Sequence, residues 1–307
     1  MSGRLHDAAL ERLGRACGGV RVRGEELVAG IQRVRVSSRM SRAVEMEVAL
    51  YRLGDVLVDA GFGHARAALV RHLAGQRLDA ICLTHHHEDH SGAAGDLAAR
   101  AGCPVYLRNA GRRHEEGLAA LKPYRHLWWG EPAPYAPEEP PATIAAGHHR
   151  LRPVPIPGHS ATHTAWLDET SGAVLTGDLF MSAGVTAVMS HENPFDSIAS
   201  LRRVADLEPA WMLTGHALAA PRPAALLRRK ADAIEQAAGR ILELHARGLS
   251  PTAITWRLFP RGRALDLWMG TLTMGEFSRG CLVRACIGHA PTRQPARLDG
   301  RCRPQIG

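Results

Sequence analysis

The sequence predicts an α/β fold in which loops that follow several strands converge at one edge of a sheet. The first observation is a set of four apolar, strand-like runs that each lead to a metal-binding side chain, at residues 80–83, 154–158, 173–177 and 211–215. The second is that a polar loop and then a helix-like segment, residues 93–100, follow the first run. Because functional groups gather on loops that a rigid sheet positions, the sequence predicts a functional site at this edge.

The segments before the first of these runs predict an antiparallel meander followed by a helix. Residues 20–36 and 44–59 alternate between apolar and polar side chains, as half-buried strands do. Gly54 and Asp55 are typical of a hairpin turn. Residues 63–73 then favour a helix.

Residues 112–141 predict a long loop that forms a lid or a wall of the substrate site. They hold six prolines and little periodicity, and Trp128 and Trp129 lie among them. These two tryptophans are therefore candidates for substrate binding. A dimer contact or a packed surface loop is the alternative, because aromatic side chains favour any interface.

The polar loop after the third run supplies another candidate for substrate contact, His191. A solvated loop histidine is the alternative interpretation. Asp196 or Ser197 is predicted to cap the helix that follows, which runs to about residue 207.

The composition changes after the fourth run and predicts a helical extension. Leu227, Ile234 and Ile241 recur every seven residues in a segment that ends before Gly248, which predicts an amphipathic helix. Two further helices are predicted at residues 251–259 and 264–287, and Trp268 is expected in the core of the second. The chain is thus expected to comprise a catalytic domain at residues 1–220, a helical extension at 221–290 and a disordered basic tail at 291–307.

The side chains at the ends of the four runs are those that bind divalent metals. Imidazole nitrogens suit zinc and iron, and a carboxylate can bridge two ions about 3.5–4 Å apart. A histidine-rich loop alone is a weak signal, because such loops also bind metals adventitiously. The seven candidates form two full sets: His85, His87 and His159 for one ion, Asp89, His90 and His216 for the second, and Asp178 between them.

These motifs together resemble the metallo-β-lactamase superfamily of metal-dependent hydrolases, over about residues 20–220. The resemblance is carried by Thr84-His85-x-His87-x-Asp89-His90, Pro157-Gly158-His159, Thr176-Gly177-Asp178 and Thr214-Gly215-His216, with residues 56–61 before them. It implies a four-layer αββα sandwich with a dinuclear site along one edge of the paired sheets. It also implies that Asp59 is buried and holds the histidine loop, and that His163 supports the ligands from behind.

Two departures from the family pattern bear on function. Thr162 precedes His163, where the family often has Gly. His87 stands where the diiron flavoprotein branch carries Glu, which disfavours a centre that reduces oxygen or nitric oxide.

The C-terminal helices resemble the helical or winged-helix-like extension of several branches of this superfamily. In one branch the extension accompanies endoribonuclease activity. In the glyoxalase II-like branch it binds the thioester substrate.

The predicted function is hydrolysis of a small ester-like substrate, with a thioester or a lactone favoured. A hydroxide held between two divalent ions would attack the electrophilic carbon, since metal coordination brings the pKa of water toward about 7. Zn²⁺ is the expected metal, with Mn²⁺ or Fe²⁺ as alternatives, and Asp89 is the expected catalytic partner for the proton. Glu88 is expected to turn away from the ions.

Three other functions stay open at this point. An endoribonuclease or phosphodiesterase is one, and Arg257, Arg261 and Arg263 near Trp256 give it a weak basic and aromatic signal. A mono-iron sulfur dioxygenase is the second. The third is a metal-stabilised binding protein without catalysis.

Composition favours a cytoplasmic protein that acts on a small molecule. The net charge is +8, but the arginines are spread along the chain, so nucleic acid is not the favoured partner. Neither a run of about 18 apolar residues nor a hydrophobic signal core is seen, so no membrane partner is expected. The six cysteines form no short CxxC pair, as expected of free thiols in a reducing compartment. A homodimer is left open.

Overall fold

The computed structural model describes residues 19–112, 121–185, 187–261 and 263–290 of the 307-residue chain. The predicted tail at residues 291–307 lies outside them. The strands are β1 (Arg21–Glu26), β2 (Gln32–Ser37), β3 (Val48–Leu53), β4 (Val56–Val58), β5 (Ala80–Cys82), β6 (Val105–Tyr106), β7 (Pro137–Glu138), β8 (Ile144–Ala146), β9 (His149–Pro155), β10 (Thr164–Asp168), β11 (Ala173–Leu175), β12 (Val188–Met189), β13 (Trp211–Leu213), β14 (Ala219–Pro221) and β15 (Phe277–Ser278). The helices are α2 (Arg39–Ala43), η1 (Gly63–Ala65), α3 (Arg66–His72), α4 (Glu88–Ser91), α5 (Ala94–Ala101), α6 (Pro123–Trp129), η3 (Gly177–Leu179), α7 (Pro194–Asp206), α8 (Ala224–Ala246), α9 (Pro251–Leu258), α10 (Arg263–Leu272) and α11 (Arg279–Gly288).

The first sheet begins with the antiparallel meander that the sequence predicts. Strands β1 to β4 pair in chain order, and β5, β6 and β7 then add in parallel. Gly54 and Asp55 join β3 to β4 as predicted. Gly54 has a φ of +52°, and a Cβ there would lie 2.6 Å from the backbone of Ala146, so only glycine fits this turn.

The second sheet has the order β14-β13-β11-β10-β9-β8. Strands β8 to β11 pair antiparallel, whereas β11 and β13 run parallel. The loops after β11 and β13 therefore leave the sheet at the same edge. The loop after β9 lies at that edge too, because β10 separates it from β11 and each of these pairs is antiparallel.

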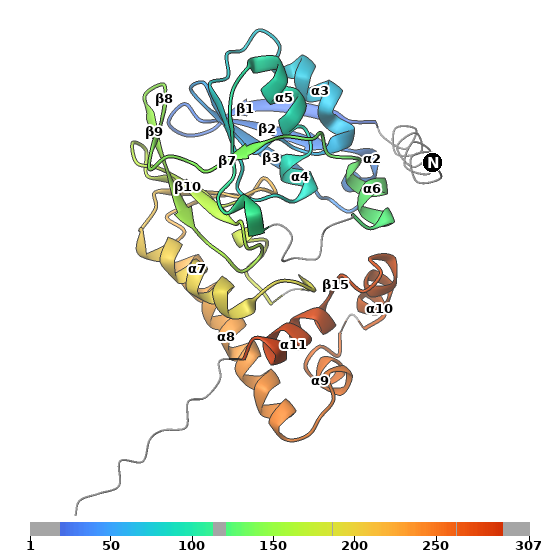
Figure 1. The fold of residues 1–307 in the computed structure, drawn as a ribbon. Coiled ribbons are helices and arrows are strands. Elements are labelled where there is room, and N and C mark those ends of the chain that lie inside the picture. Colours follow the sequence, from blue (N-terminus) through green and yellow to red (C-terminus); the bar gives the residue numbers. More distant parts are fainter. Residues whose placement is uncertain (1–18, 113–120, 186, 262, 291–307) are drawn as a thin grey trace, which may run out of the picture.

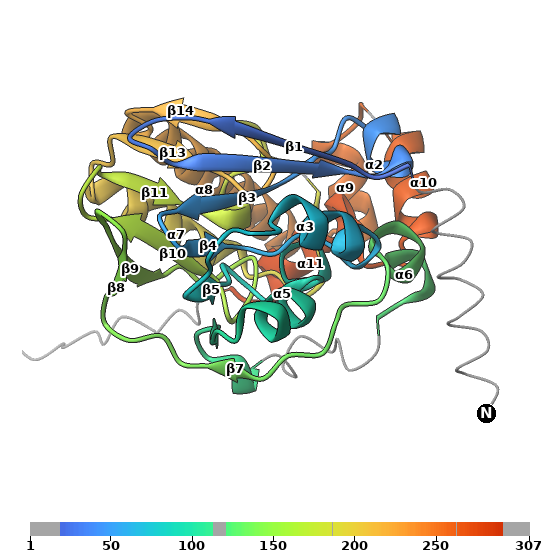
Figure 2. The same cartoon turned by 90° about the horizontal axis from the view of Figure 1, so that it is seen from above.

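Four layers result, with α3 and α5 outside the first sheet and α7 and α8 outside the second (Figures 1 and 2). Successive residues of β4 show why the strands are apolar on both faces: Leu57 packs among the outer helices, whereas Val56 and Val58 pack between the sheets. In β13, Leu213 faces the first sheet and Met212 faces the helices. The predicted αββα sandwich is confirmed.

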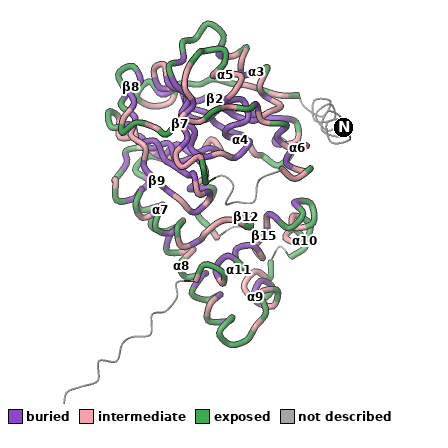
Figure 3. The backbone as a smooth tube through the Cα atoms, viewed as in Figure 1, coloured by how far each residue is buried: buried purple, intermediate pink, exposed green. Residues whose placement is uncertain are grey.

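The C-terminal extension differs in detail from the prediction. The third predicted helix is divided into α10 and α11, because β15 lies between them and pairs with β12. Helix α10 has no buried residue, and Figure 3 shows most of it exposed. Trp268 is 57% exposed, so its predicted place in the core is wrong.

Helix α8 contributes to two cores, one beneath the second sheet and one among the C-terminal helices. Its first half contributes Leu227 to the core beneath the second sheet, where it packs on α7. Its second half contributes Ile241 to a smaller core with α9 and α11. The domain boundary at residue 220 stays a prediction.

Two other sequence predictions are corrected by local structure. Residues 123–129 form α6 within the region expected to be a long loop. Asn193, not Asp196 or Ser197, caps α7, because its side chain accepts hydrogen bonds from the backbone N–H groups of residues 195 and 196.

Among the described residues, every helix is too short or too polar to cross a bilayer.

Candidate metal centre

Loops from both sheets bring seven metal-binding side chains to one edge of the sandwich. The loop after β5 supplies two histidines, and α4 directly after it supplies an aspartate and a histidine. The loops after β9, β11 and β13 supply one side chain each. All seven side chains singled out in the sequence lie in two groups: His85, His87 and His159, and Asp89, His90, Asp178 and His216.

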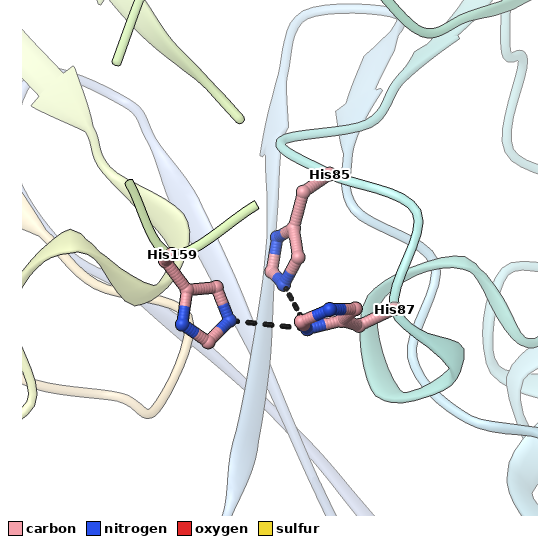
Figure 4. Close-up of side chains that lie close together, drawn as sticks. All are labelled: His85, His87 and His159. Carbon is pink, nitrogen blue, oxygen red and sulfur yellow. Dashed lines mark hydrogen bonds between the residues drawn. The ribbon is translucent and has the colours of Figure 1, made fainter. Parts of the chain in front are cut away.

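The first group consists of three imidazoles that point toward one another (Figure 4). Nδ1 of His87 lies 3.1 Å from Nε2 of His85 and 3.0 Å from Nε2 of His159. His85 is fully buried and His87 nearly so. Three ring nitrogens at one point suit a single divalent ion.

The second group combines two carboxylates with two imidazoles. Nε2 of His216 lies 3.3 Å from an Asp178 oxygen and 3.6 Å from an Asp89 oxygen. Nε2 of His90 lies 3.2 Å from the other Asp178 oxygen. A mixed set of nitrogen and oxygen donors suits zinc, iron or manganese.

Asp178 lies between the two groups. Its Oδ2 atom is 3.7 Å from Nε2 of His159 in the first group and 3.3 Å from Nε2 of His216 in the second. One carboxylate therefore faces both candidate sites. This arrangement is suited to a dinuclear metal site.

Two buried atoms of the second group show that the residues fit an ion. Within the part of the chain that the structure describes, Nε2 of His90 and Oδ1 of Asp178 are buried without a hydrogen-bond partner. Leaving such atoms unpaired is costly, and a cation between them would satisfy both.

The pKa directions of His85, His87 and Asp178 agree with metal binding. Burial, together with the nearby His90, holds the pKa of His85 well below its usual value, and burial with His85 does the same to the pKa of His87. Burial acts to raise the pKa of Asp178, but His216 and His90 outweigh it and hold that pKa well below its usual value. Neutral imidazoles and an ionised carboxylate are the forms that bind metals. Burial acts to lower the pKa of His90 and His216, but Asp178 and the other nearby carboxylates outweigh it and raise both pKa values.

Asp59 supports both groups from behind. Its Oδ2 accepts a hydrogen bond from Nδ1 of His90 at 2.8 Å and another from the Thr84 hydroxyl at 2.9 Å. The Thr84 oxygen in turn lies 3.0 Å from Nδ1 of His85. Asp59 Oδ1 also accepts the backbone N–H of Thr84 at 2.7 Å. One buried carboxylate thus orients a histidine of each group.

His163 lies beside the first group, with its ring centroid 4.9 Å from that of His85. Its Nε2 donates to the carbonyl oxygen of Thr176, two residues before Asp178. Burial and the neighbouring His159 lower the pKa of His163 to about 3, so the ring is neutral. His163 therefore holds the loop that carries Asp178.

His86 and Glu88 point away from both groups. Nδ1 of His86 lies 3.0 Å from the Thr162 hydroxyl and 3.3 Å from that of Ser160. The Glu88 carboxylate is buried in a two-bond ion pair with Arg125, at 2.5 and 2.7 Å. The predicted orientation of Glu88 is confirmed.

This orientation predicts unequal effects of three histidine substitutions. His86→Ala should leave metal content and turnover near the wild-type level, because the ring contacts hydroxyl groups outside both sites. His85→Ala and His87→Ala should each lower turnover by more than about 100-fold, beyond the usual cost of losing only a supporting group. Steady-state kinetics with matched metal analysis measures this, and equal losses in all three variants would contradict the proposed ligands.

The structure places the three candidate substrate residues in two different environments. His191 lies at the site, with its ring centroid 5.4 Å from that of His87. Trp129 is 9% exposed and packs on Phe62 in the core, so it is not a wall of the site. Trp128 packs partly buried against the same core. Aromatic content alone does not distinguish a core residue from a substrate contact.

Two residues near the centre were not anticipated from the sequence, Glu192 and Arg125. A Glu192 oxygen lies 3.4 Å from Nδ1 of His159. Burial lowers the pKa of His159, but Glu192 and then Asp178 outweigh burial and raise that pKa to about 9. Neither residue belongs to a spacing motif, so only the fold reveals them.

Comparison with known proteins agrees with this architecture. The model of the metallo-beta-lactamase superfamily matches residues 52–216, which is over half of the chain. A hydroxyacylglutathione hydrolase from Acidiphilium cryptum is 35% identical over 145 residues, which cover 47% of this chain and 52% of that protein. A thioesterase from Emericella nidulans is 28% identical over 204 residues, which cover 62% of this chain and 52% of that protein. The chain thus spans about half the length of the curated relatives it matches.

A solved structure shows the same fold. The beta-lactamase domain protein from Burkholderia ambifaria matches with a TM-score of 0.61 at 20% identity, covering 86% of this chain and 88% of that one. The four-layer sandwich with two ligand groups at one edge defines a scaffold suited to a dinuclear site. The chain belongs to the metallo-β-lactamase superfamily.

Proposed function

We propose that this protein is a two-metal hydrolase of small ester-like substrates, with acyl thioesters first and lactones next. The observation that carries the proposal is the position of Asp178, whose two oxygens face the two groups at 3.2 Å from His90 and 3.7 Å from His159. The seven residues of the two groups are the proposed ligands. Zn²⁺ is the proposed metal, because imidazoles dominate the donor set.

The chain's own residues have distinct parts in the proposed reaction. Bound divalent ions lower the pKa of water and polarise a substrate oxygen. Asp89 lies with its carboxylate 3.6 Å from Nε2 of His216, where it takes the proton released as water attacks. Asp59 keeps the ring of His90 oriented through the 2.8 Å hydrogen bond. His191, beside His87, is the proposed contact for the substrate.

The preference for thioesters comes from the relatives. Hydroxyacylglutathione hydrolase and thioesterase are the names of proteins similar to this chain, and a hydroxyacylglutathione is a thioester.

A cytoplasmic location is also proposed. The described cysteines Cys82, Cys103, Cys281 and Cys286 are free thiols, as expected in a reducing compartment.

A phosphodiester substrate is the second candidate, and one feature favours it. In the extension, the guanidinium of Arg263 lies 5.9 Å from the ring of Trp256, which is 49% exposed. Both residues line a groove of about 310 Å³. An arginine beside an exposed tryptophan can stack a base and hold a phosphate.

A substrate panel tests the proposal. Protein loaded separately with zinc, manganese and iron is assayed on acyl thioesters, lactones, RNA and a persulfide with oxygen, and chelator-treated protein is the control. Metal-dependent release of thiol from thioesters is the expected result. Cleavage of RNA alone would favour the phosphodiesterase, oxygen consumption with iron alone the dioxygenase, and metal binding without any turnover a binding protein.

A further inference from the structure

The loop that carries Glu192 lies against the turn that carries His159. Nδ1 of His159 is 3.4 Å from a Glu192 oxygen, and both side chains are 13% exposed. The opposite ring nitrogen, Nε2, is the one that faces His87 at 3.0 Å. The backbone N–H of Asn193 donates to the Gly158 carbonyl at 2.8 Å, which fixes the two segments together. The carboxylate therefore meets the side of the ring that points away from the proposed metal.

Glu192 is itself held by a tight turn. Its Oε1 accepts the backbone N–H of Met189 at 2.7 Å, and its own N–H donates to the Met189 carbonyl at 3.2 Å. A carboxylate fixed at one oxygen loses little further freedom when it also meets an imidazole. It can thus act as a fixed acceptor.

The C-terminal extension holds this turn in place. Strand β12, which contains Met189, pairs with β15 so that Met189 lies opposite Phe277. The N–H of Ser190 donates to the carbonyl of Glu276 at 2.7 Å. The Glu276 side chain accepts a hydrogen bond from the Tyr124 hydroxyl at 2.6 Å, which ties the same point to α6.

Three of the other four imidazoles in the two groups, namely His85, His90 and His216, have outer partners that belong to the sandwich. His90 has Asp59, His85 has Thr84, and Nδ1 of His216 lies 3.0 Å from the carbonyl oxygen of Glu47. In a metal-binding histidine, an acceptor at one nitrogen fixes the tautomer and leaves the lone pair of the other nitrogen for the ion.

We propose that Glu192 is a positioning residue for His159, held by β15 of the C-terminal extension so that Nε2 of His159 points into the first metal site. This inference rests on the proposed two-metal function. The extension then contributes to the first metal site without supplying a ligand to it. Such a role differs from binding the substrate, and it predicts an effect on one metal only.

Zinc binding tests the proposal separately from catalysis. Full-length wild type, Glu192→Ala and Glu192→Gln are dialysed against a series of buffered free zinc concentrations, and bound zinc is counted. Glu192→Ala should lower the affinity for one of the two zinc ions by about 10- to 100-fold and leave the affinity for the other unchanged. Glu192→Gln should lie between Ala and wild type, because its amide oxygen still accepts a hydrogen bond. Glu235→Gln, an exposed carboxylate of α8 paired with Arg202, is the matched control and should match wild type.

Activity at saturating zinc separates positioning from chemistry. Turnover of Glu192→Ala should return to near the wild-type value once two zinc ions are bound, because the carboxylate only orients the ring. In cobalt-loaded Glu192→Ala, the visible absorption bands that arise from one of the two sites should differ from those of cobalt-loaded wild type. After chelator treatment, the wild type and the variants should have similar melting temperatures.

Several results would overturn the inference. Wild-type affinity for both zinc ions in Glu192→Ala, or turnover that stays low at full loading, would do so. Fewer than two zinc ions on the wild type would overturn both this inference and the proposed function. Two zinc ions on the wild type without turnover on any substrate would overturn the function alone, and the dialysis series would still test Glu192.

Discussion

Asp178→Ala should deplete metal at both sites rather than at one. The Asp178 oxygens lie 3.2 Å from His90 and 3.7 Å from His159, so its removal takes a donor from each group. It also leaves two imidazole-rich sites without the negative charge between them, which raises the repulsion between two divalent ions. We expect zinc affinity at both sites to fall by more than about 100-fold, since loss of an outer partner alone costs 10- to 100-fold.

Elemental analysis after dialysis at a fixed free zinc concentration measures this effect. Asp232→Ala is a suitable control, because Asp232 is 55% exposed on α8 and pairs with Arg202. Loss of a single zinc ion from Asp178→Ala, with the other bound at wild-type affinity, would contradict a bridging position.

Asp89→Asn should abolish most turnover while metal stays bound. The substitution keeps the shape of the side chain and an oxygen that can face the ion, but it removes the charge that accepts a proton. A general base contributes about 100- to 10,000-fold, so kcat should fall by that order. Asp89 lies within the second group, 3.5 Å from Nε2 of His90, so a verified metal content is what separates loss of the proton acceptor from loss of an ion.

Steady-state kinetics on protein with a verified metal content measure this fall in kcat. Asp96→Asn is the matched control, because Asp96 lies on the next helix and pairs with Arg66 away from both groups. Full turnover by Asp89→Asn with two metals bound would mean that another group handles the proton. Glu88 is then a poor substitute, because Arg125 holds both of its oxygens.

Local sequence patterns predicted the elements on which the site is built. Alternation in β2 and β3 and the glycine turn at Gly54 predicted the meander, since these signals depend only on nearest neighbours along the chain. The continuous apolar runs before His85 and Asp178 predicted strands buried on both faces. The orientation of Glu88 was also predicted, although its partner Arg125 was not.

Other predictions were wrong because the same local signal fits two environments. Aromatic side chains at residues 128 and 129 were compatible with a substrate wall, but Trp129 packs on Phe62 in the core. The apolar helix that contains Trp268 was compatible with a buried element, but α10 lies at the surface. The periodicity of a helix indicates that one face differs from the other, and it does not indicate what covers that face.

The sequence by itself determined the family, the layered fold and the seven candidate ligands, because each is written in short motifs at the ends of strands. Only the tertiary structure decided how these residues meet. The packing of two sheets brings His85 and His159 together across 74 positions of the chain and places Asp178 between the two groups. It also decided that Glu192 faces His159 and that β15 pairs with β12. Such contacts depend on the register and packing of distant elements, and no spacing along the chain encodes them.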